Sequence, residues 1–357
     1  MIRGSDSSIR KHALTFDVEE HFQVSAFWTS ERRKQWDLLE SRVERNTLKI
    51  ADILAARSTK ATFFVLGWIA ERHPGLVKEL AQRGHEIASH GYGHELVSNQ
   101  TPNEFRQDIR RSKQILEDLI GKKVLGYRAP SFSVTSWAIE ILVEEGFQYD
   151  SSVNDRFRSR STGRIGTTGA CYPIATPAGV LLEIAPSTIT TFGVQLPVGG
   201  GGYFRLLPYG ATRMLLKRLE SQGSQLVIYL HPWELDPAQP RMQGALLSKA
   251  RHYFNLDKTE PGLRRLLDDF VFGPIDEVVT FSQFLHCETQ LELTAAQDTR
   301  SPICSYREAI APMRQISNEQ EASRETTACF EGANGKRGLN PIVDQQHIGL
   351  ELMKELK

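Results

Sequence analysis

The sequence predicts an α/β fold, and a (β/α) barrel is the architecture that three observations favour. Apolar runs typical of buried strands alternate along the chain with segments of helical periodicity, which is the pattern of a parallel sheet with helical crossovers. Charged or imidazole side chains follow the carboxyl ends of five of these runs. In a barrel these ends form the rim where active sites are built, although an open doubly wound sheet also places ligands there.

The predicted strands are short runs rich in apolar residues. In chain order they cover 13–16, 60–66, 86–89, 124–127, 147–149, 180–184, 226–230 and 278–281. The run 226–230 is the clearest, because Leu-Val-Ile-Tyr-Leu contains no charged residue. The five side chains that follow strand ends are Asp17, His90, Arg128, Asp150 and His231.

The predicted helices lie between these strands and cover 41–56, 74–83, 102–120, 135–145 and 262–270. Pro74 and Pro102 fit the first turn of their helices, where a missing N–H does no harm. The segment 101–104, Thr-Pro-Asn-Glu, has the spacing of a capping box. Gly84 and Gly146 follow the last apolar positions of two helices and are typical stop signals.

The composition excludes several classes of protein. Lys and Arg together number 43, as do Asp and Glu, so the formal net charge is zero and no basic field gathers nucleic acid or an anionic membrane. The four cysteines are scattered without a C-x-x-C pair, which argues against a zinc knuckle or a disulfide framework. The sequence shows no apolar signal-peptide core and no apolar run long enough to span a membrane. A soluble, cytoplasmic protein is therefore expected.

One domain followed by a tail is the predicted organisation. Alternating strand and helix patterns occupy residues 11–290. From 291 to 357, Gln, Glu, Ser, Thr, Asn and Arg dominate and the apolar periodicity fades, apart from a weakly helical stretch at 348–356. We therefore expect a globular domain over 11–290 and a polar, partly disordered carboxy-terminal extension over 291–357.

Two histidines in the segment 84–94, Gly-His-Glu-Ile-Ala-Ser-His-Gly-Tyr-Gly-His, indicate a metal site. The short strand 86–89 leads to His90, and His94 follows four residues later. Two imidazoles presented together suit a divalent metal such as zinc, which takes neutral ring nitrogens and usually at least one more ligand. On the pair alone, two surface histidines in a Gly-rich loop are a nearly equal interpretation.

Five ordered motifs resemble those of polysaccharide deacetylases with NodB homology, the carbohydrate esterase family four. The motifs are Thr15-Phe16-Asp17, His90-x-x-x-His94, Arg128-Ala129-Pro130, Asp150 and Leu230-His231. They lie within residues 11–284, and their shared order argues against a chance match. The resemblance implies a distorted (β/α) barrel with fewer than eight regular strands.

Two further stretches resemble one subgroup of that family, the exosortase-associated deacetylases of PEP-CTERM systems. They are Gly-Gly-Gly-Gly-Tyr-Phe-Arg at 199–205 and His-Pro-Trp-Glu at 231–234. This subgroup implies a place in exopolysaccharide biosynthesis.

The first motif departs from the family pattern of two adjacent aspartates, a base followed by a metal ligand. Val18 occupies the second position, and the next acid is Glu19. Since some relatives carry an acid-x-acid variant, Glu19 resembles the displaced ligand and would join the two histidines around a divalent metal, with zinc expected. Glu20 and His21 are the alternative ligands.

The resemblance also implies the acid–base groups. Asp17 would act as the general base, and Arg128 would keep its carboxylate ionised and oriented. His231 would be the general acid for the leaving amine, and Asp150 would hold its ring in one tautomer. Each residue also has a purely structural alternative. Asp17 could cap a loop and Arg128 could form a structural salt bridge. His231 could be a core histidine, and Asp150 could form an Asx turn.

Aromatic residues beside the motif loops are candidates for lining a sugar groove. They are Phe132, Tyr203, Phe204 and Trp233. Packing under a loop is the simpler interpretation for the first three, whereas Trp233 directly follows the His231-Pro232 turn.

The sequence thus predicts a metal-dependent hydrolase that removes acetyl groups from N-acetylhexosamine units of a glycan. Zinc would lower the pKa of a water molecule and polarise the acetamide carbonyl. No nucleotide, flavin or nicotinamide motif is present, so no organic cofactor is expected, and the lack of a Gly-x-Ser-x-Gly elbow disfavours a serine esterase. Two alternatives stay open: hydrolysis of small amides or cyclic imides, and glycan binding without catalysis.

Overall fold

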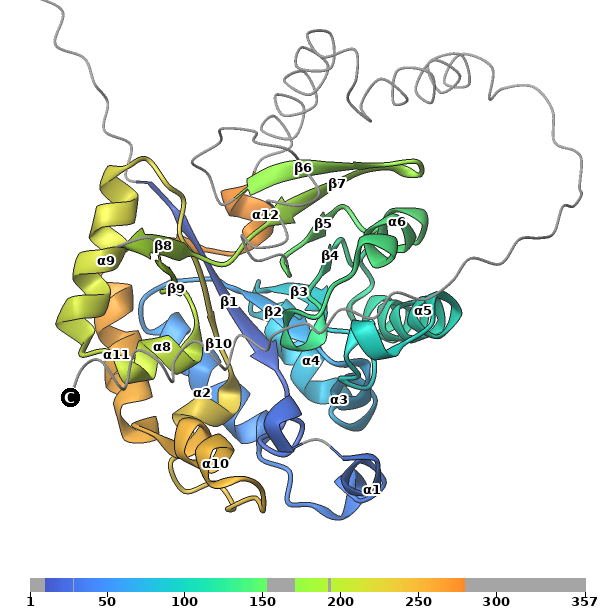
Figure 1. The fold of residues 1–357 in the computed structure, drawn as a ribbon, viewed down its shortest axis with the longest axis horizontal. Coiled ribbons are helices and arrows are strands. Elements are labelled where there is room, and N and C mark those ends of the chain that lie inside the picture. Colours follow the sequence, from blue (N-terminus) through green and yellow to red (C-terminus); the bar gives the residue numbers. More distant parts are fainter. Residues whose placement is uncertain (1–9, 28, 153–170, 192–193, 280–357) are drawn as a thin grey trace, which may run out of the picture. The chain divides into compact units, whose positions relative to one another are not determined.

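Nine strands form one curled, mostly parallel sheet in the computed structural model, which describes residues 10–27, 29–152, 171–191 and 194–279 (Figure 1). The strand order is β10, β1, β2, β3, β4, β5, β7 and β6, and β11 pairs with the start of β1. The bounds are β1 His12–Val18, β2 Thr62–Val65, β3 Glu86–Ser89, β4 Gly126–Tyr127, β5 Tyr149–Asp150, β6 Cys171–Thr176, β7 Gly179–Ile184, β10 Val227–Leu230 and β11 Phe272–Gly273. The predicted α/β fold, a distorted barrel, is confirmed as a half-barrel.

Helices cover this sheet and connect its parallel strands (Figure 1). In chain order they are α1 Ser30–Arg33, α2 Val43–Ala55, α3 Gly67–Arg72, α4 Pro74–Gln82, α5 Pro102–Ile120, α6 Ser136–Glu144, α8 Gly201–Leu206, α9 Tyr209–Ser221, α10 Leu246–Tyr253, α11 Leu256–Asp269 and α12 Ile275–Val278. The predicted capping box is present, because Glu104 N–H donates to Thr101 Oγ1 and Thr101 N–H donates to the Glu104 carboxylate. Within the described ranges, every helix is too short or too polar to cross a membrane.

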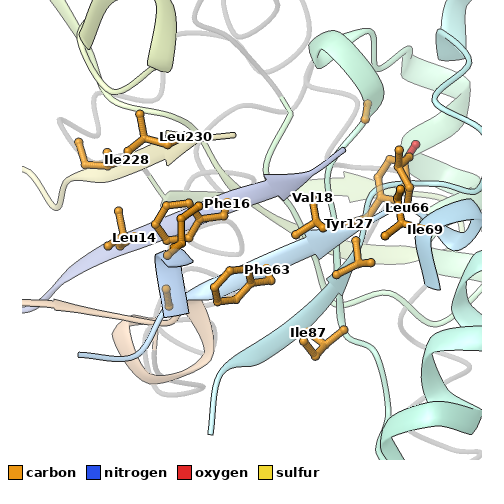
Figure 2. Packing of buried hydrophobic residues seen from close by; sticks show 14 of the residues in the cluster. Leu14, Phe16, Val18, Phe63, Leu66, Ile69, Ile87, Tyr127, Ile228 and Leu230 are labelled. Atoms are coloured by element: carbon orange, nitrogen blue, oxygen red, sulfur yellow. The ribbon is translucent and has the colours of Figure 1, made fainter. Parts of the chain in front are cut away.

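Alternate residues of the strands face two different layers. Figure 2 shows Leu14, Phe16 and Val18 of β1 in one apolar cluster with Phe63, Leu66, Ile69, Ile87, Tyr127, Ile228 and Leu230. Because successive side chains of a strand point to opposite faces, Thr15 and Asp17 lie on the other face of β1. Burying each large apolar side chain stabilises the fold by roughly 1.5–3 kcal/mol, so the apolar face fixes where Asp17 points.

The register of the parallel strands brings their carboxyl ends together. Phe16 of β1 pairs with Leu230 of β10, so the residues that follow, Asp17 and His231, come side by side. The last residues of β3 and β4 also pair with each other. The polar residues that follow these strands are therefore delivered to one rim of the half-barrel.

The structure differs from the sequence-based prediction at one predicted strand and at three strands that were not predicted. The predicted strand 278–281 is wrong in its described part, because Val278 ends the short helix α12, and the nearby strand is β11, which comes earlier in the chain. Sequence periodicity also failed to indicate β6, which is antiparallel to β7, and a small separate sheet of β8 (Thr188–Thr191) and β9 (Val194–Pro197). Residues 280–281, the extension 291–357 and its weak helix 348–356 lie outside the described residues.

Candidate active site

Asp17 and Arg128 form a buried ion pair at the carboxyl end of the sheet. Arg128 Nη1 donates to Asp17 Oδ1 over 2.7 Å and to Thr15 Oγ1 over 2.8 Å. The other guanidinium nitrogens donate to the backbone and hydroxyl oxygens of Ser151. The guanidinium also lies 4.1 Å from the centre of the Phe64 ring. The predicted contact is therefore present, and a cation fixed by four hydrogen bonds orients the Asp17 carboxylate.

Glu19, His90 and His94 form a buried cluster next to this pair. One potential ligand atom from each lies within 4.8 Å of the other two. His90 directly follows β3, and Gly91, with a φ of 74°, turns the chain so that His94 comes back toward it. His90 Nδ1 lies 2.8 Å from the Arg128 carbonyl oxygen, which leaves Nε2 free to ligate.

The electrostatics of this cluster fit a divalent metal ion. Burial lowers the pKa of His90 to about 4, so its ring is in the neutral form that binds metals. Burial alone would raise the pKa of Glu19, but the rings of His94 and His231 lower it below its ordinary value. His94 Nε2 lies 2.5 Å from Glu19 Oε2, whereas His94 Nδ1 is buried without a hydrogen-bond partner. Two imidazoles and a carboxylate brought together in a buried position are the donor set that a divalent metal requires.

The alternative ligands proposed from the sequence have other contacts. The Glu20 carboxylate accepts from the backbone N–H groups of Arg42 and Val43 and so caps the start of α2. His21 Nδ1 lies 3.6 Å from Glu20 rather than within the cluster. The geometry thus favours Glu19 as the third ligand.

His231 faces the same site from the end of β10. Its Nε2 lies 3.8 Å from Asp17 Oδ2 and 3.7 Å from Glu19 Oε1. Burial would lower the pKa of His231, but the carboxylates of Glu234, Glu19 and Asp17 raise it to about 9. The ring is therefore protonated at neutral pH, as a proton donor must be.

The expected pairing of Asp150 with His231 is wrong. Asp150 Oδ1 accepts from the Ser152 hydroxyl, and its carboxyl group also interacts with Glu183 of β7. Burial raises the pKa of Asp150 to about 6. The physical reason is the sheet order, in which β5 is separated from β10 by four strands. His231 Nδ1 instead lies 3.2 Å from Glu234 Oε2.

Trp233 does not line a sugar groove, contrary to the prediction from its position. The side chain is buried, and its Nε1–H donates to Glu19 Oε1 over 3.0 Å. Its ring stacks between those of His231 and His252, with centroid separations of 5.1 and 4.2 Å. Trp233 therefore orients the carboxylate of the cluster rather than a ligand in solution.

The other predicted aromatic residues have mixed positions. Phe132 is partly exposed and packs its ring 4.8 Å from that of Tyr229, close to the Arg128 guanidinium. Tyr203 is partly exposed, with its hydroxyl buried and without a hydrogen-bond partner. Phe204 is buried in the core. Phe132 and Tyr203 stay candidates for substrate contact.

Glu234 and Arg205 are site residues that sequence reasoning missed. Both are buried, and Arg205 Nε donates to Glu234 Oε1 over 2.9 Å. The available signal was an acid three residues after His231, the spacing of a capping box at the end of a strand.

Comparisons with known proteins assign the two halves of this site to different sequence families. Residues 6–149 match the family described as polysaccharide deacetylase, and residues 151–280 match one described as a domain of unknown function, DUF3473. The peptidoglycan-N-acetylglucosamine deacetylase of Bacillus cereus is 31% identical over 124 residues, 30% of this chain and 45% of that protein. The peptidoglycan deacetylase of Helicobacter pylori is 33% identical over 93 residues, 26% of this chain and 32% of that protein. The chain thus spans less than half of these relatives' length.

A solved structure agrees with the fold. A candidate polysaccharide deacetylase from Mycobacterium smegmatis has a TM-score of 0.52 and 21% identity, covering 81% of this chain and 93% of that one. Asp17, the three-residue cluster and Arg128 all fall in the first matched segment, whereas His231 falls in the second. Residues 6–149 of this chain therefore match the polysaccharide deacetylase family, the family that the motifs resemble.

Proposed function

We propose that this protein is a metal-dependent hydrolase that removes acetyl groups from N-acetylhexosamine units of a polysaccharide. One observation carries the proposal: the cluster of Glu19, His90 and His94 lies at the same rim as Asp17 and His231. A metal site, an oriented carboxylate and a protonated histidine within one site are what hydrolysis of an amide needs. The match of residues 6–149 to polysaccharide deacetylases supports the same chemistry.

The three clustered side chains would hold the metal. Imidazole and carboxylate are ligands that zinc accepts, and three protein ligands leave a position open. When bound, zinc would supply Lewis-acid polarisation of the acetamide carbonyl and a lowered pKa for water.

The chain's own residues would move the protons. Arg128 holds one oxygen of Asp17, so the other oxygen is directed toward the site, where it would accept a proton from the attacking water. As water oxygen bonds to the acetyl carbon and the carbon–nitrogen bond breaks, His231 would give its proton to the nitrogen. The products are acetate and a free amino sugar.

We further propose that the substrate is an exopolysaccharide under synthesis. The support is the resemblance of 199–205 and 231–234 to exosortase-associated deacetylases. A cell that produces only the Asp17→Asn protein should export polymer with a raised N-acetyl content, which polymer composition analysis measures. The cytoplasmic location stays a prediction, to be checked by cell fractionation.

The domain limits are also a proposal. We infer a self-sufficient domain over 11–290 and an accessory extension over 291–357, since the family matches end at residue 280. A protein ending at residue 290 should unfold cooperatively and keep its activity, and loss of cooperative unfolding would place the extension in the core.

The deciding experiment is acetate release from a panel of N-acetylated oligosaccharides. We expect release that stops with a chelator, returns with zinc and is absent in Asp17→Asn. Release from small amides or cyclic imides alone would support the first alternative. Glycan binding by the zinc-loaded protein without any acetate release would support a non-catalytic protein.

A further inference from the structure

Two stretches of the sequence, one of which directly follows His231, have no role in the chemistry proposed above. They are Gly199 to Arg205 and Pro232 to Glu234, and both lie in the segment 151–280 that matches a domain of unknown function. The structure brings them into contact behind His231, on the side of the ring away from Asp17.

The turn after β10 folds Glu234 back onto the histidine. A 3-10 turn covers Pro232–Leu235, and within it Glu234 Oε2 accepts from the His231 backbone N–H over 2.9 Å. The same oxygen lies 3.2 Å from His231 Nδ1. Since one carboxylate oxygen receives both groups, it fixes the position of the backbone and the rotation of the ring together.

Arg205 holds the other oxygen of Glu234. Its Nε donates to Glu234 Oε1 over 2.9 Å, and its Nη1 donates to the carbonyl oxygens of His252 and Phe254 over 3.0 and 2.7 Å. Both oxygens of Glu234 and two nitrogens of Arg205 in this buried pair therefore have partners. Burial would raise the pKa of Glu234, but Arg205 and His231 lower it to about 2, so the carboxylate stays ionised.

The glycines explain how the carboxylate fits. A Cβ on Gly201 would lie 2.1 Å from an oxygen of Glu234, so no side chain is possible there while Glu234 keeps its place. A Cβ on Gly202, the next residue of α8, would meet nothing within 4 Å. The run 199–205 thus supplies both the space for Glu234 and the cation that holds it.

We propose that Glu234, held by Arg205, is the positioning residue for His231, taking the role that the sequence had predicted for Asp150. The Glu234 carboxylate accepts from Nδ1–H of His231 and so keeps Nε2 of the same ring directed at Asp17 and Glu19. This inference rests on the proposed function, because it gives His231 the part of proton donor. It also assigns a task to the second matched segment, which completes the site of the first.

The kinetic test compares two leaving groups. In zinc-loaded Glu234→Gln, release of acetate from N-acetylated chitooligosaccharide should fall about 10²–10⁴-fold, the usual contribution of an acid–base group. Hydrolysis of 4-nitrophenyl acetate should fall by less than about 10-fold, because its phenolate leaves without a proton. Asp236→Asn is the matched control: this buried acid of the same turn pairs with Arg42 and Arg45 and should leave both rates near wild type.

A second test reads the ring without any substrate. In ¹⁵N-histidine-labelled protein, at a pH high enough to leave the ring neutral, the His231 signals, assigned by their loss in His231→Gln, should report a proton fixed on Nδ1. Glu234→Gln and Gly201→Ala should both change that signature, whereas Gly202→Ala should not. An unchanged signature in Glu234→Gln, or equal losses of rate on amide and ester, would overturn the positioning role. Failure of the wild-type protein to release acetate would instead overturn the proposed function, and the ring signature would still decide the role of Glu234.

Discussion

The two ends of the half-barrel both hold carboxyl groups, but in opposite environments. At the carboxyl ends of the strands, Glu19 and Glu234 face histidine rings and the Arg205 guanidinium. At the amino ends, Glu86 accepts from the hydroxyl groups of Thr62 and Tyr149 over 2.6 and 2.7 Å. Cationic neighbours lower the pKa of the first two, whereas burial and the nearby Asp276 raise the pKa of Glu86 to about 7.

This difference teaches that the neighbours, rather than the residue type or the sheet, decide what a buried carboxyl group can do. A carboxylate kept ionised between cations can ligate a metal or accept a proton. A carboxyl group that binds its proton up to neutral pH and accepts from hydroxyls ties strands together instead. We therefore expect chemistry at one end of the half-barrel and only stability at the other.

The largest expected contrast is between Asp17→Asn and Glu86→Gln. Removing the oriented base should lower acetate release about 10²–10⁴-fold, while the same change of acid to amide at the opposite end should leave the rate within a few-fold of wild type. Initial rates on one N-acetylated oligosaccharide measure both. Metal content should be equal in the two variants, since neither residue is a proposed ligand. A comparable loss of rate in Glu86→Gln would abolish the division between the two ends.

A smaller effect should follow from Trp233→Phe. The substitution removes the N–H that donates to Glu19 while keeping an aromatic ring between His231 and His252. Loss of an outer partner of a metal ligand typically costs 10–100-fold in metal affinity, so zinc competition should show a weaker dissociation constant in that range. Trp36→Phe is the control, because this buried tryptophan packs on Phe22 and Trp68. Unchanged affinity in Trp233→Phe would mean that the contact does not serve the ligand.

Much of the active rim could be predicted from local patterns. An apolar run precedes each of Asp17, His90, Arg128 and His231. Parallel strands place the residues that follow them at one edge of the sheet, independently of the loop conformations. The capping residues of α5 likewise act within four residues of each other. Predictions succeeded where a single strand or helix end carries the information.

What the sequence could not supply is the partner of each side chain across the fold. Whether Asp150 or Glu234 faces His231 depends on the sheet order and on the path of one turn, and both carboxylates follow strand ends. Trp233 looked like a surface residue because it follows the His231 turn, yet its N–H reaches a carboxylate 214 positions away. The strands β6, β8 and β9 are only four to six residues long, and β6 and β9 each contain a proline, so their own sequences give a weak signal; each becomes a strand by antiparallel pairing with its neighbour in the chain.

The smallest expected effect concerns the pH dependence of stability set by Glu86. Its pKa is about 7 in the folded protein and near 4.5 when unfolded, so the folded state binds the extra proton between these values. This contribution to the free energy of unfolding is complete below about pH 4.5 and is lost as the pH rises through 7, by on the order of 1–3 kcal/mol. Glu86→Gln should lack that decline and gain relative stability at pH 8. Denaturant titrations at pH 5 and pH 8 measure it, with Asp268→Asn as control, since the pKa of that exposed acid is lowered by Arg57 and lies below the window. Parallel declines in wild type and Glu86→Gln would show that Glu86 stays ionised, and the contrast between the two ends would then fail.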